Sequence, residues 1–372
     1  MKLIIDCFKQ VKGAGKSIGI YNLTKNLVAH LAEENEYSHK IEEIIVLGNS
    51  QNRQDFALKG ISFVEIPYDP LNKLRFIYWE LFQVKRYMKS CKGDRILFPR
   101  GYAPLFFRGK DTIIIHDLIP FYYHKNYPGV FDPLENFYIM WRLKASMRHA
   151  DRIITISDYS RQEIERIVPG VKEKINVIYN GLNDLPQNET ARVRDQKSRE
   201  ERPYLCAMAS KLPHKNAKGI LEAYRLYWNN AEKPLPLKLI GLPSVEEFDI
   251  GEAARDVICY PYVKDDAELY DMIGSSQCFL FLSLIEGFGF PPLEAMQLKT
   301  PVICSDRTSL PEVVKEAALL TDPENPIETA EKIERLLKDR ELQEKLIAAG
   351  EENCLRFDWG SRTKLYMEEL IR

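Results

Sequence analysis

Along the first half of the chain, short apolar and β-branched runs alternate with amphipathic segments of helical length. The runs predict strands at residues 3–7, 43–47, 62–66, 95–98, 112–115, 152–155 and 176–179. The amphipathic segments predict helices near residues 17–34, 72–91, 134–149 and 158–167. Runs that are apolar at every position, such as Ile113-Ile114-Ile115, are typical of parallel strands buried on both faces. The first half therefore predicts a parallel sheet covered by helices.

The alternation stops at residues 184–202, where charged residues dominate and large apolar residues are scarce. This composition predicts a linker or an exposed loop. Strands are predicted again at residues 204–208, 237–240, 257–260, 278–282, 302–304 and 318–320, and helices near 216–229, 266–275, 291–298 and 325–338. A last helical segment is broken near Phe357-Asp358-Trp359. Two successive arrays of this kind predict two doubly wound α/β domains.

Composition narrows the class of protein. A chain of 372 residues with 45% hydrophobic and 28% charged residues is globular, and its length favours two domains. The start, Met1-Lys2-Leu3-Ile4-Ile5-Asp6, lacks the features of a signal peptide, and no apolar stretch is long enough to span a membrane. Seven cysteines without a Cys-x-x-Cys pair predict a reduced, cytoplasmic protein without a zinc site.

The charge is divided unevenly between the halves. The whole chain has 52 Lys+Arg and 54 Asp+Glu, a net charge of −2. Residues 1–183 carry 27 basic and 20 acidic residues, whereas the remainder carries 25 and 34. A basic half and an acidic half predict that the two domains meet different partners.

The most specific motif is EGFGFPPLEAM at residues 286–296. It follows a predicted buried strand and opens a helix, so its glycines allow a ligand to approach the backbone near the helix N-terminus. Glu286 precedes this helix and Glu294 lies within it, which predicts that they contact different parts of one ligand. The alternative is a helix-capping turn with a surface glutamate.

This motif closely resembles the signature of the retaining GT-B glycosyltransferases of family GT4, and other segments match that family in order. The resemblance implies an acceptor-binding domain at residues 1–183, a linker at 184–202, a nucleotide-sugar-binding domain at 203–350, and a C-terminal helix, 351–372, that returns to the first domain. It implies two Rossmann-like domains facing a central cleft.

The resemblance also implies roles for individual residues on the donor side. Glu286 contacts the donor hexose and Glu294 the ribose of the nucleotide. The backbone of Gly287, Phe288, Gly289 and Phe290 faces the sugar and the diphosphate. In the segment ASKLPHKN, residues 209–216, Lys215 matches the lysine that neutralises the leaving diphosphate. Lys211 occupies the place of the family arginine but lacks its bidentate fork.

In the first half, His116 follows the strand at 112–115 in the segment HDLIP, which resembles the motif whose histidine contacts the transferred sugar. Its neighbour Asp117 is a second candidate, with turn capping as the alternative. Ser157 and Asn180 also match family positions on the acceptor side. For these two residues a helix N-cap and an Asn-Gly turn are the structural alternatives.

Gly15 and Gly19 lie in a loop between the first strand and the first helix, where the family brings the diphosphate or the acceptor close to the backbone. The Gly15-Lys16-Ser17 sequence also suggests a P-loop, but Gln10 stands where a Walker A motif requires glycine. Nucleotide hydrolysis through this loop remains a separate hypothesis.

The resemblance implies transfer of a hexose with retention of configuration, from a nucleotide-sugar to a saccharide or lipid-linked saccharide acceptor in glycan synthesis. The pairing of HDLIP with EGFGFPPLEAM favours GDP-mannose, with a UDP- or dTDP-sugar as the alternative. No Asp-x-Asp motif occurs, so no metal and no cofactor are expected. A non-catalytic sugar-nucleotide-binding protein is the alternative of another class.

The acceptor side leaves two interpretations open. Ile77, Leu81, Val84 and Met88 form an apolar stripe with lysines beside it, which suits either an anionic membrane at the inner face or packing within the domain. Aromatic residues at 121–123 and 137–141 could shape a sugar or lipid groove. The acidic second half and the lack of a known nucleic-acid-binding motif argue against binding to nucleic acid. The oligomeric state is not predicted.

Overall fold

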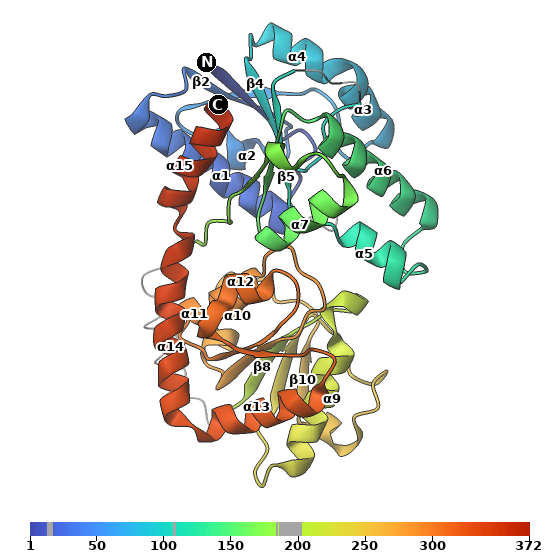
Figure 1. Cartoon of the computed structure of the whole chain (residues 1–372), viewed down its shortest axis with the longest axis vertical. Helices are drawn as coiled ribbons and strands as arrows, with labels where there is room; N and C mark the ends of the chain where they lie inside the picture. Colours follow the sequence, from blue (N-terminus) through green and yellow to red (C-terminus); the bar gives the residue numbers. More distant parts are fainter. Residues whose placement is uncertain (13–17, 106, 108, 184, 186–202) are drawn as a thin grey trace. The chain divides into compact units, whose positions relative to one another are not determined.

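The computed structural model describes residues 1–12, 18–105, 107, 109–183, 185 and 203–372. These residues form two compact units (Figure 1), one made of Met1–Gly181 with Trp359–Arg372 and one of Leu182–Asp358. The predicted linker at 184–202 lies outside the described residues except for Leu185. No described helix is long and apolar enough to cross a membrane.

The first unit contains a seven-stranded parallel sheet in the order β3-β2-β1-β4-β5-β6-β7. Its strands are β1 (Lys2–Asp6), β2 (Glu43–Gly48), β3 (Ile61–Glu65), β4 (Arg95–Phe98), β5 (Asp111–Ile115), β6 (Arg152–Thr155) and β7 (Ile175–Val177). Every residue of β4 and β5 is buried, as expected for central strands covered on both faces.

Helices connect these strands. They are α1 (Ile18–Ser38), α2 (Arg53–Phe56), α3 (Lys73–Tyr78), the π-helical turn η1 (Trp79–Gln83), α4 (Val84–Ser90), α5 (Ile119–Asn126), α6 (Pro133–His149), α7 (Asp158–Ile167) and the 3-10 turn η2 (Lys172–Lys174). The N-terminus of α6 shows how sequence sets an element: Asp132 accepts from the Glu135 amide at 2.8 Å, and Pro133 opens the helix.

The helix predicted at 72–91 is interrupted by η1, and this changes which side chains face outward. The π turn widens the helix and rotates the residues after it. Ile77, before the π turn, and Leu81, within it, are exposed, whereas Val84, after it, is fully buried and Met88 packs on the core. The predicted stripe is therefore not one continuous outer face.

The second unit contains a six-stranded parallel sheet in the order β10-β9-β8-β11-β12-β13, the strand order of the Rossmann fold. Its strands are β8 (Leu205–Met208), β9 (Leu237–Ile240), β10 (Val257–Tyr260), β11 (Cys278–Phe281), β12 (Val302–Ser305) and β13 (Leu319–Thr321). The two sheets confirm the predicted pair of doubly wound domains.

The helical elements of this unit are η3 (Pro213–Lys215), α9 (Ala217–Asn230), η4 (Gly251–Asp256), α10 (Asp266–Gly274), α11 (Phe290–Gln297), α12 (Leu310–Val314), η5 (Lys315–Ala317), α13 (Pro326–Lys338), α14 (Arg340–Cys354) and η6 (Leu355–Phe357). Residues 351–358 belong to this unit, so the returning segment begins at Trp359.

The last helix, α15 (Trp359–Ile371), packs against α1 in the first unit (Figure 1). The Trp359 ring stacks on His30 with ring centroids 5.1 Å apart. A Cβ at Gly181 would lie 2.1 Å from the Trp359 ring, so only glycine allows this close approach. Packing of the C-terminal helix on the first domain is therefore confirmed.

Candidate functional site

Two predicted donor-side residues meet in the second unit at the point where the strand order reverses. Lys215 ends η3 in the loop after β8, and Glu286 lies in the loop after the neighbouring β11. Such a switch point is where doubly wound sheets bind ligands. Lys215 Nζ lies 2.6 Å from Glu286 Oε1, and the two side chains are 28% and 11% exposed. The pair is thus partly withdrawn from water and still reachable by a ligand.

Asn216 ties the two loops together and positions Lys215. Its backbone is left-handed, with φ 53°, and its side chain caps α9 by accepting from the Gly219 amide at 3.2 Å. The same side chain donates to the Leu282 carbonyl at 3.0 Å and to the Pro323 carbonyl at 2.8 Å. The sequence motif includes Asn216, but only the structure reveals this bridging role.

Two hydroxyl side chains hold the loop that carries Glu286. Thr308 Oγ1 accepts from the Glu286 amide at 3.1 Å. The fully buried Ser309 donates to the Glu286 and Phe288 carbonyls at 3.0 and 3.1 Å. Gly289 has φ 109°, and a Cβ there would lie 2.5 Å from Leu310 Cδ2, so glycine is required at this turn.

The start of α11 offers fewer amide donors than an ordinary helix. Pro291 and Pro292 lack an N–H group, so they remove two of the donors that a helix N-terminus usually presents. Among the described residues, none accepts a hydrogen bond from the amides of Gly287 or Gly289. These loop amides, rather than the first helical turn alone, are available to a phosphate.

The other donor-side candidates differ in their surroundings. The Phe288 side chain is buried against Phe290 and Phe357, so only its backbone can face a ligand. Glu294 is half-buried, and burial raises its pKa to about 7, with a further contribution from the charge of Asp266. Lys211 is exposed.

In the first unit, His116 directly follows β5 and is bonded to the loop after β4. Its Nε2 lies 2.6 Å from the Pro99 carbonyl, which can only accept, so Nε2 carries the proton. The His116 pKa is lowered to about 4. Burial is the main cause, the Arg100 charge acts in the same direction, and the hydrogen bond to Pro99 acts in the opposite direction. His116 is therefore neutral at pH 7, with Nδ1 as an acceptor.

Of the remaining first-unit candidates, Asp117 and Ser157 accept hydrogen bonds from backbone amides, and Gly15 lies outside the described residues. Asp117 accepts from the Ile119 amide at 3.0 Å, and the buried Ser157 caps α7 by accepting from the Ser160 amide at 3.1 Å. Asn180 is buried, and its Oδ1 has no hydrogen-bond partner among the described residues. Gly19 lies in the first turn of α1, whereas Gly15 falls in the part not described.

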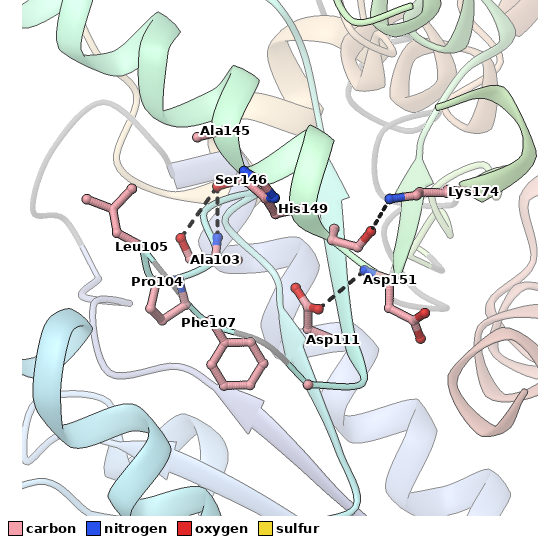
Figure 2. A pocket seen from close by; sticks show the side chains of 12 residues that line it. Ala103, Pro104, Leu105, Phe107, Asp111, Ala145, Ser146, His149, Asp151 and Lys174 are labelled. Carbon is pink, nitrogen blue, oxygen red and sulfur yellow. Dashed lines mark hydrogen bonds between the residues drawn. The ribbon is translucent and has the colours of Figure 1, made fainter. Parts of the chain in front are cut away.

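A separate cavity of about 380 Å³ lies near the amino ends of β5 and β6 (Figure 2). Its polar groups contact their neighbours: Asp111 accepts from the Asp151 amide at 3.3 Å, and Lys174 donates to the Arg148 and Ala150 carbonyls. Burial raises the Asp111 pKa to about 6. None of the predicted site residues lines this cavity.

Two family models match adjacent parts of the chain. Residues 19–184 match "Glycosyltransferase Family 4", and residues 188–353 match "Glycosyl transferases group 1". O-antigen chain mannosyltransferase B of Escherichia coli is 30% identical over 236 residues, which are 61% of this chain and 62% of that protein. O-antigen chain mannosyltransferase RfbU of Salmonella typhimurium is 27% identical over 58% of this chain and 57% of that protein. The matches thus span less than two thirds of these relatives.

Solved structures agree with the fold. WaaG, a glycosyltransferase involved in lipopolysaccharide biosynthesis, has a TM-score of 0.70 at 13% identity, covering 99% of both chains. Anabaena HepE, solved with UDP and glucose, has a TM-score of 0.69 at 17% identity, covering 100% of this chain and 99% of that one. The solved structures show that the chain has the GT-B fold. The two family models, which together match residues 19–184 and 188–353, show that the chain belongs to the group 1, family 4 glycosyltransferases.

Proposed function

We propose that this protein transfers mannose from GDP-mannose to a saccharide or lipid-linked saccharide during cell-surface polysaccharide synthesis, retaining the configuration of the anomeric carbon. The choice of mannose is supported by the names of the O-antigen mannosyltransferases that the chain resembles. Transfer of another hexose from a UDP- or dTDP-sugar is the alternative within the same fold.

The observation that carries the proposal is the pairing of Lys215 with Glu286 at the switch point of the second unit. A bound donor would break this ion pair and contact both side chains itself. Lys215 would meet the diphosphate, and Glu286 would accept from sugar hydroxyls, as a carboxylate accepts strongly from O–H donors. Without a donor, each of the two groups supplies the counter-charge of the other.

In the proposed reaction the bond between the anomeric carbon and the phosphate oxygen breaks, and its electron pair leaves with the diphosphate. The acceptor hydroxyl oxygen bonds to the anomeric carbon, and the hydroxyl proton is released. Charge develops on the departing phosphate, where Lys215 and the amides of Gly287 and Gly289 would stabilise it without a metal ion. Glu294 would bind the ribose hydroxyls.

His116 would contribute as a neutral hydrogen-bond acceptor. Because its Nε2 proton is donated to the Pro99 carbonyl, Nδ1 can accept from a hydroxyl of the transferred sugar. Its low pKa keeps this nitrogen unprotonated throughout the physiological range.

We further propose that the protein works at the inner face of a membrane, as a peripheral protein. Large apolar side chains are exposed on residues 71–82, most of which belong to α3 and η1, and on α6. We call this set the aromatic face, and it comprises Leu71, Leu74, Ile77, Tyr78, Leu81, Phe82, Leu134, Phe137, Tyr138 and Trp141. Its two parts are linked by the buried Glu80–Arg142 ion pair at 2.8 Å. Basic residues within the segment 71–82 suit anionic lipid.

Donor binding tests the proposal directly. We expect GDP-mannose to raise the thermal midpoint of the protein more than UDP-, dTDP- or ADP-sugars do. Lys215→Gln and Glu286→Gln should each weaken donor binding at least tenfold without loss of folding. Lys233→Gln and Glu331→Gln, which change exposed residues of the same unit, should bind like the wild type.

Failure of every nucleotide-sugar to bind would contradict the proposal. Binding without transfer would favour the non-catalytic alternative. Nucleotide hydrolysis that is abolished by Lys16→Ala would favour the alternative of an NTPase that uses the loop at residues 15–17.

A further inference from the structure

Two basic residues, Lys9 and Arg100, lie in the first unit, in the loops that follow the carboxyl ends of β1 and β4. This is the switch point of the seven-stranded sheet, because β1 and β4 are neighbours although β2 and β3 lie between them in sequence. Lys9 follows β1, and Arg100 follows β4. Neither residue belongs to the donor-side or acceptor-side candidates predicted from the sequence.

Buried hydrogen bonds fix the backbone that carries Lys9. Asn49 donates to the carbonyls of Phe8 and Gln10, at 2.7 and 3.1 Å, and Asn52 donates to those of Cys7 and Gln10, both at 2.8 Å. Both asparagines are fully buried. The loop after β1 is therefore built rigidly as far as residue 10, which places Lys9 at a defined position.

The backbone on either side of Arg100 is fixed as well. The Pro99 carbonyl accepts from His116, and the Gly101 amide donates to the Phe98 carbonyl at 3.2 Å. Gly101 has φ 77°, and a Cβ there would lie 3.0 Å from the Ile114 carbonyl oxygen, so the turn requires glycine. Arg100 is consequently held between the ends of β4 and β5.

Arg100 lies close enough for its charge to act on Lys9, and no carboxylate of the described residues forms an ion pair with either cation. Burial lowers the Arg100 pKa. Burial, followed by the Arg100 charge, lowers the Lys9 pKa. Lys9 Nζ donates to the Pro70 carbonyl at 2.5 Å and lies 4.7 Å from the centroid of the Phe76 ring. Two partly buried cations without a counter-ion are costly for the folded protein.

Three acidic groups lie near the two cations, and each accepts hydrogen bonds from other residues. Asp69 accepts a hydrogen bond from the Leu71 amide at 2.9 Å. Glu80 forms a bidentate ion pair with Arg142, at 2.8 and 3.0 Å. Asp6 accepts from the Phe8 amide at 3.1 Å and from Trp79 Nε1 at 3.3 Å. Trp79 and Glu80 both belong to the π turn η1, a kind of distortion that is frequent at functional sites.

We propose that Arg100 and Lys9 form a subsite that binds a phosphoryl group of the acceptor. The planar fork of Arg100 can bind two phosphate oxygens, and Lys9 adds a point charge. Two cations favour a phosphate or diphosphate ester over a monoanionic carboxylate. The subsite deepens the proposed function, because it specifies that the acceptor carries phosphate; its binding of phosphate can be tested without any transfer reaction.

The test is calorimetric titration of inorganic pyrophosphate into the full chain carrying Lys215→Gln, which weakens the proposed donor site. We expect Arg100→Gln and Lys9→Gln to weaken pyrophosphate binding at least tenfold in this background, and Arg100→Lys to weaken it less. Arg148→Gln removes one exposed positive charge from the same unit and should leave the affinity unchanged. Thermal melts verify that each variant folds.

Further titrations identify the source of the phosphate. A short-chain prenyl diphosphate that binds more tightly than pyrophosphate would support a lipid-linked acceptor, and equal affinity would support a soluble phosphorylated saccharide. Unchanged pyrophosphate affinity in Arg100→Gln would overturn the subsite, as would glucuronate binding as tightly as pyrophosphate. Because donor binding is measured separately, either result would leave the donor-site proposal standing.

Discussion

Glu286 and Glu294 belong to one motif, yet the fold places them in different electrostatic surroundings. Glu286 is paired with Lys215, whereas Glu294 lies in the second turn of α11 without an ion pair among the described residues. Burial raises the Glu294 pKa to about 7. The carboxylate proposed to hold the ribose therefore changes its charge close to neutral pH.

This pKa predicts that donor affinity depends on pH. Below about pH 7 the Glu294 carboxylate gains a proton and loses acceptor capacity, so the donor dissociation constant should rise by up to about tenfold per pH unit. Glu294→Gln should bind weakly at every pH. Calorimetry between pH 5.5 and 8.5 measures this, and a flat wild-type profile would contradict the role of Glu294.

The same group makes a separate prediction for stability. Its folded pKa lies above the unfolded value, so the folded state binds the proton more tightly. The stability of the donor-free protein should therefore fall as pH rises from about 4 to about 7. Glu294→Gln removes this penalty and should melt at a higher temperature than the wild type at pH 8, as thermal denaturation would show.

At the scale of single residues, the sequence predicted the identity of the donor-side groups but not how they are held. Lys215 and Glu286 were found through a motif, and their ion pair depends on two loops 71 residues apart in sequence. Asn216, Thr308 and Ser309 hold these loops in place through hydrogen bonds to backbone atoms of distant loops. The sequence does not show which backbone atoms lie close to them, so these contacts could not be predicted. Arg100 and Lys9 could not be paired from the sequence for a similar reason: only the sheet order brings them together.

At the scale of elements, strands were the most predictable part of the fold. The strands predicted at residues 95–98 and 152–155, each around an apolar centre, match β4 and β6 at both ends. Helices were predicted less accurately than strands where their apolar pattern is irregular. Three short helices, α2, α5 and α12, and the first part of α14 were not predicted. The π turn inside the segment 73–90 interrupts the 3.6-residue periodicity on which the helix prediction rests.

The aromatic face predicts binding to anionic membranes. Phe82 and Phe137 are 63% and 64% exposed, on different helices of this face. Phe82→Ser with Phe137→Ser should reduce co-sedimentation with vesicles containing phosphatidylglycerol several-fold. Tyr37→Ser removes an aromatic ring that is 86% exposed on α1, outside this face, and should have no effect. Equal sedimentation of all three proteins would argue against membrane binding through this face.

At the scale of the whole molecule, the basic and acidic halves of the chain correspond to different proposed binding sites. The basic half, residues 1–183, carries the aromatic face and the proposed Arg100–Lys9 subsite, whereas the acidic half carries Lys215 and Glu286. In the acidic half, the proposed phosphate contacts are local. In the basic half, we propose that many exposed cations act together on an anionic partner, and such interactions are screened by salt.

Raising the salt concentration should therefore weaken membrane or acceptor binding more than donor binding. We expect vesicle binding to fall several-fold between 50 and 500 mM NaCl, with a smaller change in the affinity for GDP-mannose. Parallel vesicle sedimentation and calorimetry measure both quantities. Equal salt sensitivity would contradict the division of partners between the two halves.

The central claim is that Lys215 and Glu286 serve retaining transfer of a hexose from a nucleotide-sugar. The most direct test is NMR analysis of the product formed from GDP-α-mannose and a saccharide acceptor. The account predicts an α-linked mannoside from the wild type and at least a hundredfold slower transfer by folded Lys215→Gln and Glu286→Gln. A β-linked product, or full activity in both variants, would contradict it.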